Sequence, residues 1–221
     1  MIGLVSIVMW LWFQATFDAY LTVHFFLDCE PYVGAQVALD QWKSTFDGLH
    51  TSWSPHIFDV KHQPLMQENM AFVHKRVLFL ILHIVSDYYD IESERRLRHS
   101  NQLAWANDQI NNYKSKIDAI VIIGHSPPTP LNRDFFTLKE GGIATTIGNL
   151  KIPTVYIHGS GHKFAEEERF NSVDNFLRIM VPGRQANPVR VSFDRSKRFY
   201  FDFNDDEIQT KCCADGWPTL S

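Results

Sequence analysis

Residues 118–128 read Asp-Ala-Ile-Val-Ile-Ile-Gly-His-Ser-Pro-Pro, and residues 153–162 read Pro-Thr-Val-Tyr-Ile-His-Gly-Ser-Gly-His. In each segment a short apolar run, rich in β-branched residues, stops at a turn of Gly, His, Ser or Pro. Such runs are typical of buried strands. Ligands of open sheets collect at the carboxyl ends of parallel strands, so we expect His125 and His158 at one sheet edge. Neutral imidazole binds Zn, Fe, Ni and Mn-type ions, and the pattern therefore indicates a metal or phosphate site.

The composition is that of one globular domain. The chain has 221 residues, of which 45% are hydrophobic and 21% charged, which argues against wholesale disorder. Aromatic residues make up 14% and include 17 Phe, enough to supply the apolar faces of two packed sheets. A formal net charge of -4 shows no sign of nucleic-acid binding. Three cysteines do not make a disulfide framework and leave the compartment open.

Residues 1–27 form a segment of their own. Residues 1–13 are almost wholly apolar, as in the core of a signal peptide, but a basic flank and a small-x-small cleavage pattern are missing. The run is also shorter than the about 20 residues of a membrane span. We expect a buried helix from Ile2 to Tyr20 and a buried strand from Leu21 to Leu27. A cleaved signal, which would make the protein secreted rather than cytoplasmic, and membrane association through residues 1–20 are the alternatives.

Residues 28–203 alternate between helical and strand patterns, and residues 204–221 are expected to form a loose tail. Residues 51–67 read as an irregular connection. The expected helices are 36–49, 92–116 and 133–150, the last interrupted by Gly141-Gly142. The expected strands are 70–75, 76–85, the two histidine-ended runs, 176–181, 189–193 and 198–203. Helix–strand units followed by antiparallel strands predict an α/β (α+β) fold of two packed sheets with helices outside.

Finer features within these elements can also be read from the sequence. Lys75-Arg76 is expected to be a tight turn, and residues 194–197 a hairpin connection. The long helix is expected to bury one broad face drawn from Leu97, Leu103, Ala104, Ala106, Ile110 and Tyr113.

The sequence argues against a serine hydrolase. The nucleophile elbow G-x-S-x-G requires Gly two residues after Ser, so that the chain can turn sharply. Here that position holds Pro128, and Ser126 is therefore assigned a structural role. Asp118 is expected to mark the entry to its strand rather than to act as a catalytic acid. The histidines inside helix or strand patterns, which are His74, His83 and His99, are expected in the core or at the surface.

Taken together, the order and spacing of these motifs resemble the second half of a calcineurin-like metallophosphoesterase. The matching segments are Trp42–Phe46, Glu68–Phe79, Ile120–His125 and Val155–His162 within a region from Phe25 to Phe203. The resemblance implies an α-β-β-α two-sheet sandwich, incomplete at its N-terminal side. It also implies two divalent ions that bind a phosphate ester and activate water. His125 matches the histidine of the family's late Gly-His motif, and His158 and His162 match its final histidine pair.

The chain departs from the family upstream. The motifs Asp-x-His, Gly-Asp-x-x-Asp and Gly-Asn-His-Asp/Glu, which supply the bridging aspartate and catalytic histidine, are absent, and Ser160 stands where the related branch has Asp. Two or three imidazoles without a carboxylate lack the charge to hold two dications close together, whereas one borderline ion (Mn, Fe or Zn) is compatible with them. The cofactor prediction is therefore divalent metal, one ion rather than two.

Three hypotheses follow for the function. The first is a metal-dependent phosphoesterase, impaired or inactive in this chain, that acts on a small or phosphorylated substrate. The second is a non-catalytic remnant or binding module that keeps the fold. The third, based on residues 1–13, is a secreted or membrane-attached protein of unrelated function. No nucleic-acid partner is expected, and the substrate class stays open.

Overall fold

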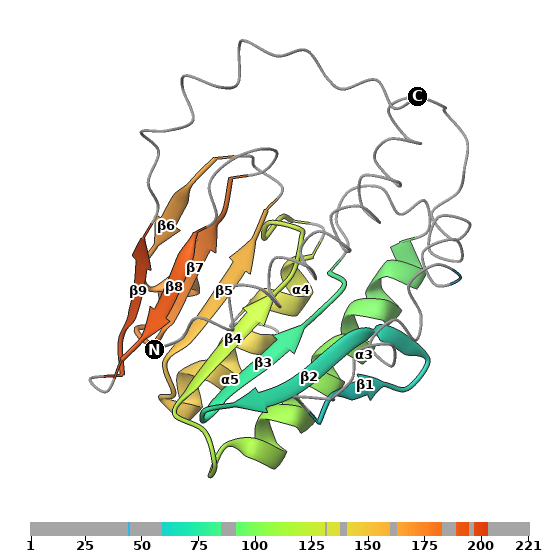
Figure 1. Cartoon of the computed structure of the whole chain (residues 1–221). Helices are drawn as coiled ribbons and strands as arrows, with labels where there is room; N and C mark the ends of the chain where they lie inside the picture. The colour runs from blue at the N-terminus through green and yellow to red at the C-terminus, as the bar shows by residue number, and fades with distance from the viewer. Residues whose placement is uncertain are drawn as a thin grey trace, which may run out of the picture.

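The central element is a seven-stranded mixed sheet with the order β1-β2-β3-β4-β5-β7-β6 (Figure 1). The computed structural model describes residues 44, 59–84, 92–130, 132–137, 141–159, 163–182, 189–194 and 197–202. The strands are β1 (Lys61–Gln63), β2 (Met66–His74), β3 (Val77–Ile81), β4 (Ala119–Ile123), β5 (Thr154–His158), β6 (Ala165–Glu167) and β7 (Phe176–Met180). The predictions for residues 1–27 and 204–221 lie outside the described residues, as does the helix at 36–49 apart from Ser44, which is helical.

The middle of the sheet is parallel and its flanks are antiparallel. Strands β3, β4, β5 and β7 run parallel, whereas β1–β2, β2–β3 and β6–β7 pair antiparallel. Ile81 pairs with Ile123, and Ile123 pairs with Ile157. The carboxyl ends of β3, β4 and β5 are therefore level with one another, which is the arrangement that places ligands at one edge.

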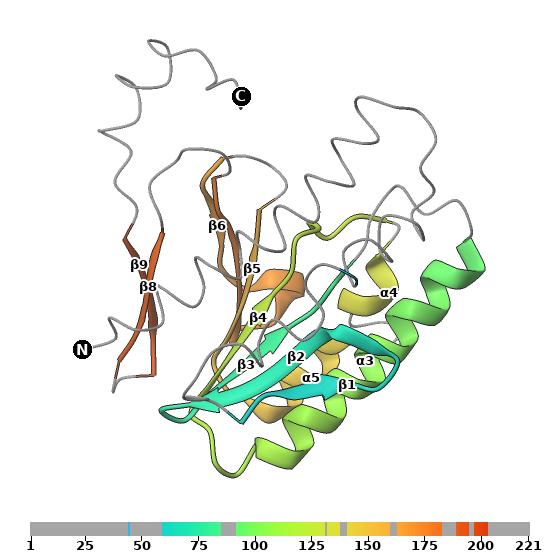
Figure 2. The same cartoon turned by 45° about the vertical axis from the view of Figure 1, so that its right-hand side comes forward.

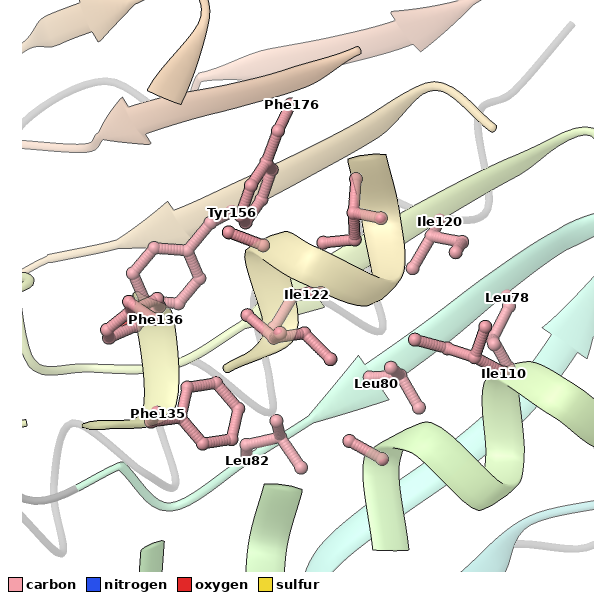
Figure 3. Packing of buried hydrophobic residues seen from close by; sticks show 14 of the residues in the cluster. Leu78, Leu80, Leu82, Ile110, Ile120, Ile122, Phe135, Phe136, Tyr156 and Phe176 are labelled. Atoms are coloured by element: carbon pink, nitrogen blue, oxygen red, sulfur yellow. The ribbon is translucent and has the colours of Figure 1, made fainter. Parts of the chain in front are cut away.

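Within the described ranges, one face of the sheet is covered by the α-helices α3 (Glu92–Tyr113), α4 (Arg133–Phe136) and α5 (Ile143–Leu150). A short 3-10 turn, η2 (Phe170–Ser172), lies on the same side. The main core is formed here from the alternate residues of each strand and from the helices' apolar side chains, several of which Figure 3 shows interlocked. Each residue of β4 is buried, as expected for a parallel strand covered on both faces.

A two-stranded sheet lies against the opposite face. Strands β8 (Arg190–Phe193) and β9 (Phe199–Asp202) pair antiparallel, and Figure 2 shows this hairpin apart from the helices. Val191, Phe199 and Phe201 pack against the second core cluster, which includes Val155 and other residues on that face of the large sheet. The described residues thus form a mixed α/β fold, with a large mixed sheet, helices on one of its faces and a second small sheet.

Several local predictions are confirmed. Lys75 and Arg76 have φ values of 46° and 64° and connect β2 to β3, as a turn of the type I′ kind does. The helix predicted after residue 133 is divided into α4 and α5 on either side of Gly141-Gly142. The hairpin predicted near the C-terminus is β8–β9, and residues 194–197 link its strands.

Two predictions are wrong. Residues 51–67 are not wholly irregular, since β1 lies at 61–63 and β2 begins at Met66; pairing between the strands overrides their mixed polar sequence. In α3, Leu97 is 62% exposed and Ala104 is exposed. Both lie about half a turn from the buried Ala106 around a helix of about 3.6 residues per turn. The face that turns to the sheet near the start of α3 is polar instead.

Candidate functional site

The segments that follow β4 and β5 lie side by side. The backbone N–H of Gly124 donates to the carbonyl of Ile157 at 3.0 Å, and the N–H of Gly159 donates to the carbonyl of His125 at 3.3 Å. The prediction that the His125 and His158 segments meet at one sheet edge is therefore confirmed for the backbone. His125 is half-buried and His158 is buried. His162 lies outside the described residues.

The His158 side chain lies on the helix-covered face of the sheet. Its ring stacks on Tyr156, two residues earlier, with the centroids 5.3 Å apart and an interplanar angle of 23°. Burial, and secondarily the charge of Arg178, lowers the pKa of His158 to about 3. Neither ring nitrogen has a hydrogen-bond partner among the residues that the structure describes. His158 is thus a neutral imidazole with a free lone pair, the form in which histidine binds a metal.

The loop after β4 is held in a single shape. Asn132 donates to Ser126 Oγ at 3.0 Å and to the carbonyl of Pro127 at 2.8 Å, and it accepts from the backbone N–H of Thr129 at 2.7 Å. The phenol of Tyr156 donates to the carbonyl of Ser126, and burial raises the pKa of Tyr156 so that it stays a donor. These contacts support a structural role for Ser126.

Gly124 permits this arrangement because it has no side chain. A Cβ at residue 124 would lie 2.8 Å from the hydroxyl oxygen of Tyr156 and 3.3 Å from Ile84. The close approach of Tyr156 to the strand end therefore explains why the residue before His125 is a glycine.

A buried polar cluster at the end of β3 is a feature that sequence reasoning missed. Arg98 donates to Glu68 Oε1 at 2.6 Å, and His83 Nδ1 lies 4.0 Å from the same oxygen. Gln102 donates to the carbonyl of His83 at 2.7 Å, and Asn69 accepts from the His83 N–H at 2.7 Å. Burial by itself would raise the pKa of Glu68, but the His83 ring and the bond from Arg98 bring this pKa below its usual value.

The sequence did contain a signal for this cluster. Arg95, Arg98 and Gln102 have the helical spacing that places them on the same face as Ala106 and Ile110. Counting back from Ile110 and Ala106 in steps of three or four residues identifies the side chains at the start of α3 that face the sheet, whether they are apolar or polar.

The side chains that could ligate a metal do not cluster among the described residues. No group of three or more His, Cys, Asp or Glu side chains within the described ranges is close enough to hold a metal. The segment from Gly124 to Pro130 contains an imidazole but no carboxylate. His158 is a buried imidazole without a hydrogen-bond partner among the described residues, a form that can serve as one ligand of a metal ion. In the part of the chain that the structure describes, no helix is both long enough and apolar enough to span a membrane.

Comparisons with known proteins add little to this geometry. Neither the protein-family models nor the curated proteins include a match to the chain. Among solved structures, the fold is similar to a chain described as "GAP50 the anchor in the inner membrane complex of Plasmodium", with 12% sequence identity and a TM-score of 0.33. The match covers 67% of this chain and 45% of that chain, so this chain spans less than half of that protein's length. A likeness this distant carries no argument about function.

Proposed function

We propose that the chain is a metal-dependent phosphoesterase of the α-β-β-α class whose hydrolytic activity is impaired. In this proposal one divalent ion of the Mn, Fe or Zn type is held at the ends of β4 and β5 by His125, His158 and His162. The observation that carries the proposal is His158, which is buried, neutral and without a hydrogen-bond partner among the described residues. A polar group buried in this way is unfavourable unless something binds it.

The chain's own residues prepare the site in two ways. The low pKa of His158 means that no proton competes for its nitrogen at neutral pH. The hydrogen bonds of Asn132 and Tyr156 fix the loop that carries His125, so that little ordering is needed when a ligand binds. A bound divalent ion would supply Lewis-acid activation of the phosphate ester and of water.

The absence of carboxylates from the loop after β4 favours a second candidate, a binding module without turnover. General acid–base chemistry on a phosphate ester requires a group that exchanges protons near neutral pH. His158, with its pKa at about 3, does not meet this requirement. In the described cluster at the end of β3, Glu68 is already paired with Arg98. Both candidates bind metal, and they differ in hydrolysis.

Calorimetric titration of metal-free protein with Mn²⁺ and Zn²⁺ tests the metal binding that both candidate functions require. We expect about one ion to bind per chain. The binding affinity should fall at least about tenfold in His125→Ala. It should be unchanged in the control His74→Ala, because His74 lies at the sheet edge opposite to the proposed site. Failure of the wild-type protein to bind either ion, or equal binding by His125→Ala, would overturn the site. Two ions per chain would overturn the single-ion prediction.

Hydrolysis of an aryl phosphate in the presence of the same ions separates the two candidates. A metal-dependent rate that falls in His125→Ala supports the phosphoesterase. Equal rates in wild type and His125→Ala rule out hydrolysis at this site and leave the binding module.

A further inference from the structure

The turns at the amino ends of the parallel strands lie at one edge of the sheet, opposite to the candidate metal site. Val77 of β3 pairs with Ala119 of β4, and Ile120 of β4 pairs with Thr154 of β5, so these strands begin level with one another. Figures 1 and 2 show the starts of β3, β4, β5 and β9 at the lower left. Because β3, β4 and β5 each have five residues, this amino edge lies roughly 16 Å from the carboxyl ends.

Exposed cations gather on the amino edge from segments that are far apart in the sequence. They come from the β2–β3 turn, the segment between α3 and β4, the residue after α5 and the β8–β9 connection. The bond from Arg76 and, in smaller part, the charge of Lys197 lower the pKa of the Asp118 carboxyl, so the β8–β9 connection lies near the start of β4. The exposed cations of these segments are Lys75, Arg76, Lys114, Lys116, Lys151, Lys197 and Arg198.

The described carboxylates of the same edge are fewer than these cations. Asp118 pairs with Arg76 at 2.6 Å, and Asp194 lies in the β8–β9 connection. Asp174, which precedes β7, pairs with Arg169 at 2.7 Å. The chain as a whole has a formal net charge of -4. The amino edge is therefore basic, although the chain that carries it is acidic.

The backbone of these turns would suit glycine or asparagine better than a long cationic residue. The φ values of Lys75, Arg76, Lys151 and Lys197 are 46°, 64°, 58° and 61°. Side chains other than those of Gly, Asn and Asp rarely occupy this left-handed region, because the Cβ crowds the backbone. Unfavourable backbone conformations that recur at one edge suggest that the side chains serve a purpose other than folding.

We propose that the amino edge binds the surface of an anionic lipid bilayer. The cations project from turns at about one level of the sheet rather than from a helix or a groove, and such a distribution suits a flat surface. Each Lys or Arg near an anionic leaflet adds to the attraction. Nucleic acid suits the edge less well, because the overall negative charge of the chain opposes close contact with a polyanion. A bilayer contacts the basic edge alone, and the opposite edge then faces the solution.

Co-sedimentation of the full chain with lipid vesicles tests this proposal. Vesicles of phosphatidylcholine with about 30% phosphatidylserine are compared with vesicles of phosphatidylcholine alone, at low and high salt. The test variant combines Lys116→Gln, Lys151→Asn and Lys197→Asn, because Asn tolerates a positive φ. The matched control removes the same charge from exposed residues near the carboxyl ends of the strands, by Arg96→Gln, Arg133→Gln and Lys163→Gln.

The wild-type protein and the control are expected to bind the anionic vesicles but not the neutral ones, and to be released as the salt concentration rises. The test variant should bind at least about tenfold more weakly. Its stability in urea should be unchanged, because the three substituted side chains are exposed.

Several results would overturn the proposal. Wild-type protein that stays in solution with anionic vesicles has no such surface. Equal losses of binding in the test and control variants would show that the amino edge is not the contact. Equal binding to neutral vesicles would assign the contact to apolar residues instead. Tighter binding to duplex DNA than to anionic vesicles at the same salt concentration would assign the edge to nucleic acid. Metal titration uses no vesicles, so this proposal and the proposed function can fail separately.

Discussion

Replacing His158 by leucine is expected to remove a specific part of the acid sensitivity of this protein. In the folded chain burial, and secondarily Arg178, lowers the pKa of His158 from an ordinary value of 6.5 to about 3. Between these two pH values the unfolded chain binds one more proton at this residue than the folded chain does. The wild-type protein therefore loses stability as the pH falls below 6.5, and above 6.5 the residue contributes no pH dependence.

The size of the effect follows from the shift. Each pH unit between the two pKa values changes the free energy of unfolding by up to about 1.4 kcal/mol. Lowering the pH from about 7 to about 4.5 should thus remove about 2.5 kcal/mol that is attributable to His158. Leucine is apolar and similar in volume, so it fills the space beside Tyr156 without a titrating group.

Urea unfolding of wild type and His158→Leu at about pH 7 and about pH 4.5 measures the difference. Other groups titrate in both proteins and cancel, including His74, whose pKa is also lowered by burial. The difference in the free energy of unfolding between the two proteins should change by about 2–3 kcal/mol in favour of the variant at the lower pH. An equal loss of stability in both proteins would show that His158 is not buried as a neutral imidazole, and the main support for the metal site would disappear.

Two further substitutions test the packing around the site by urea unfolding. Gly124→Ala is expected to destabilise the fold by about 1–3 kcal/mol, because its Cβ would lie 2.8 Å from the Tyr156 hydroxyl. The control is Gly148→Ala in α5, where the added Cβ would meet Val173 at an ordinary distance of 3.5 Å. This control should stabilise the fold by about 0.5–1 kcal/mol. Destabilisation by both to the same extent would contradict the role of Tyr156. Asn132→Ala removes the three hydrogen bonds that shape the loop after β4 and should lower the free energy of unfolding by about 2–3 kcal/mol. A change of less than about 0.5 kcal/mol would show that other contacts hold the loop.

The strands, the long helix and the turns could largely be predicted from local patterns in the sequence. A β-branched run such as residues 119–123 has few alternatives to a buried strand. The turn at Lys75-Arg76 can be predicted because it joins two adjoining strand-like runs, although neither residue favours positive φ. The place of Asp118 at the strand entry also follows from the sequence, and its carboxylate pairs there with Arg76 at 2.6 Å.

The sequence by itself thus indicated the two hairpins and that His125 and His158 follow strands that end at one sheet edge. Only the tertiary structure decided what surrounds each of these side chains. It placed His158 against Tyr156 on the helix-covered face, and it joined Glu68 to Arg98 across 30 positions of the sequence. Periodicity is a property of neighbouring residues, whereas burial and charge compensation depend on elements that are distant in the sequence and become neighbours only when the sheet forms.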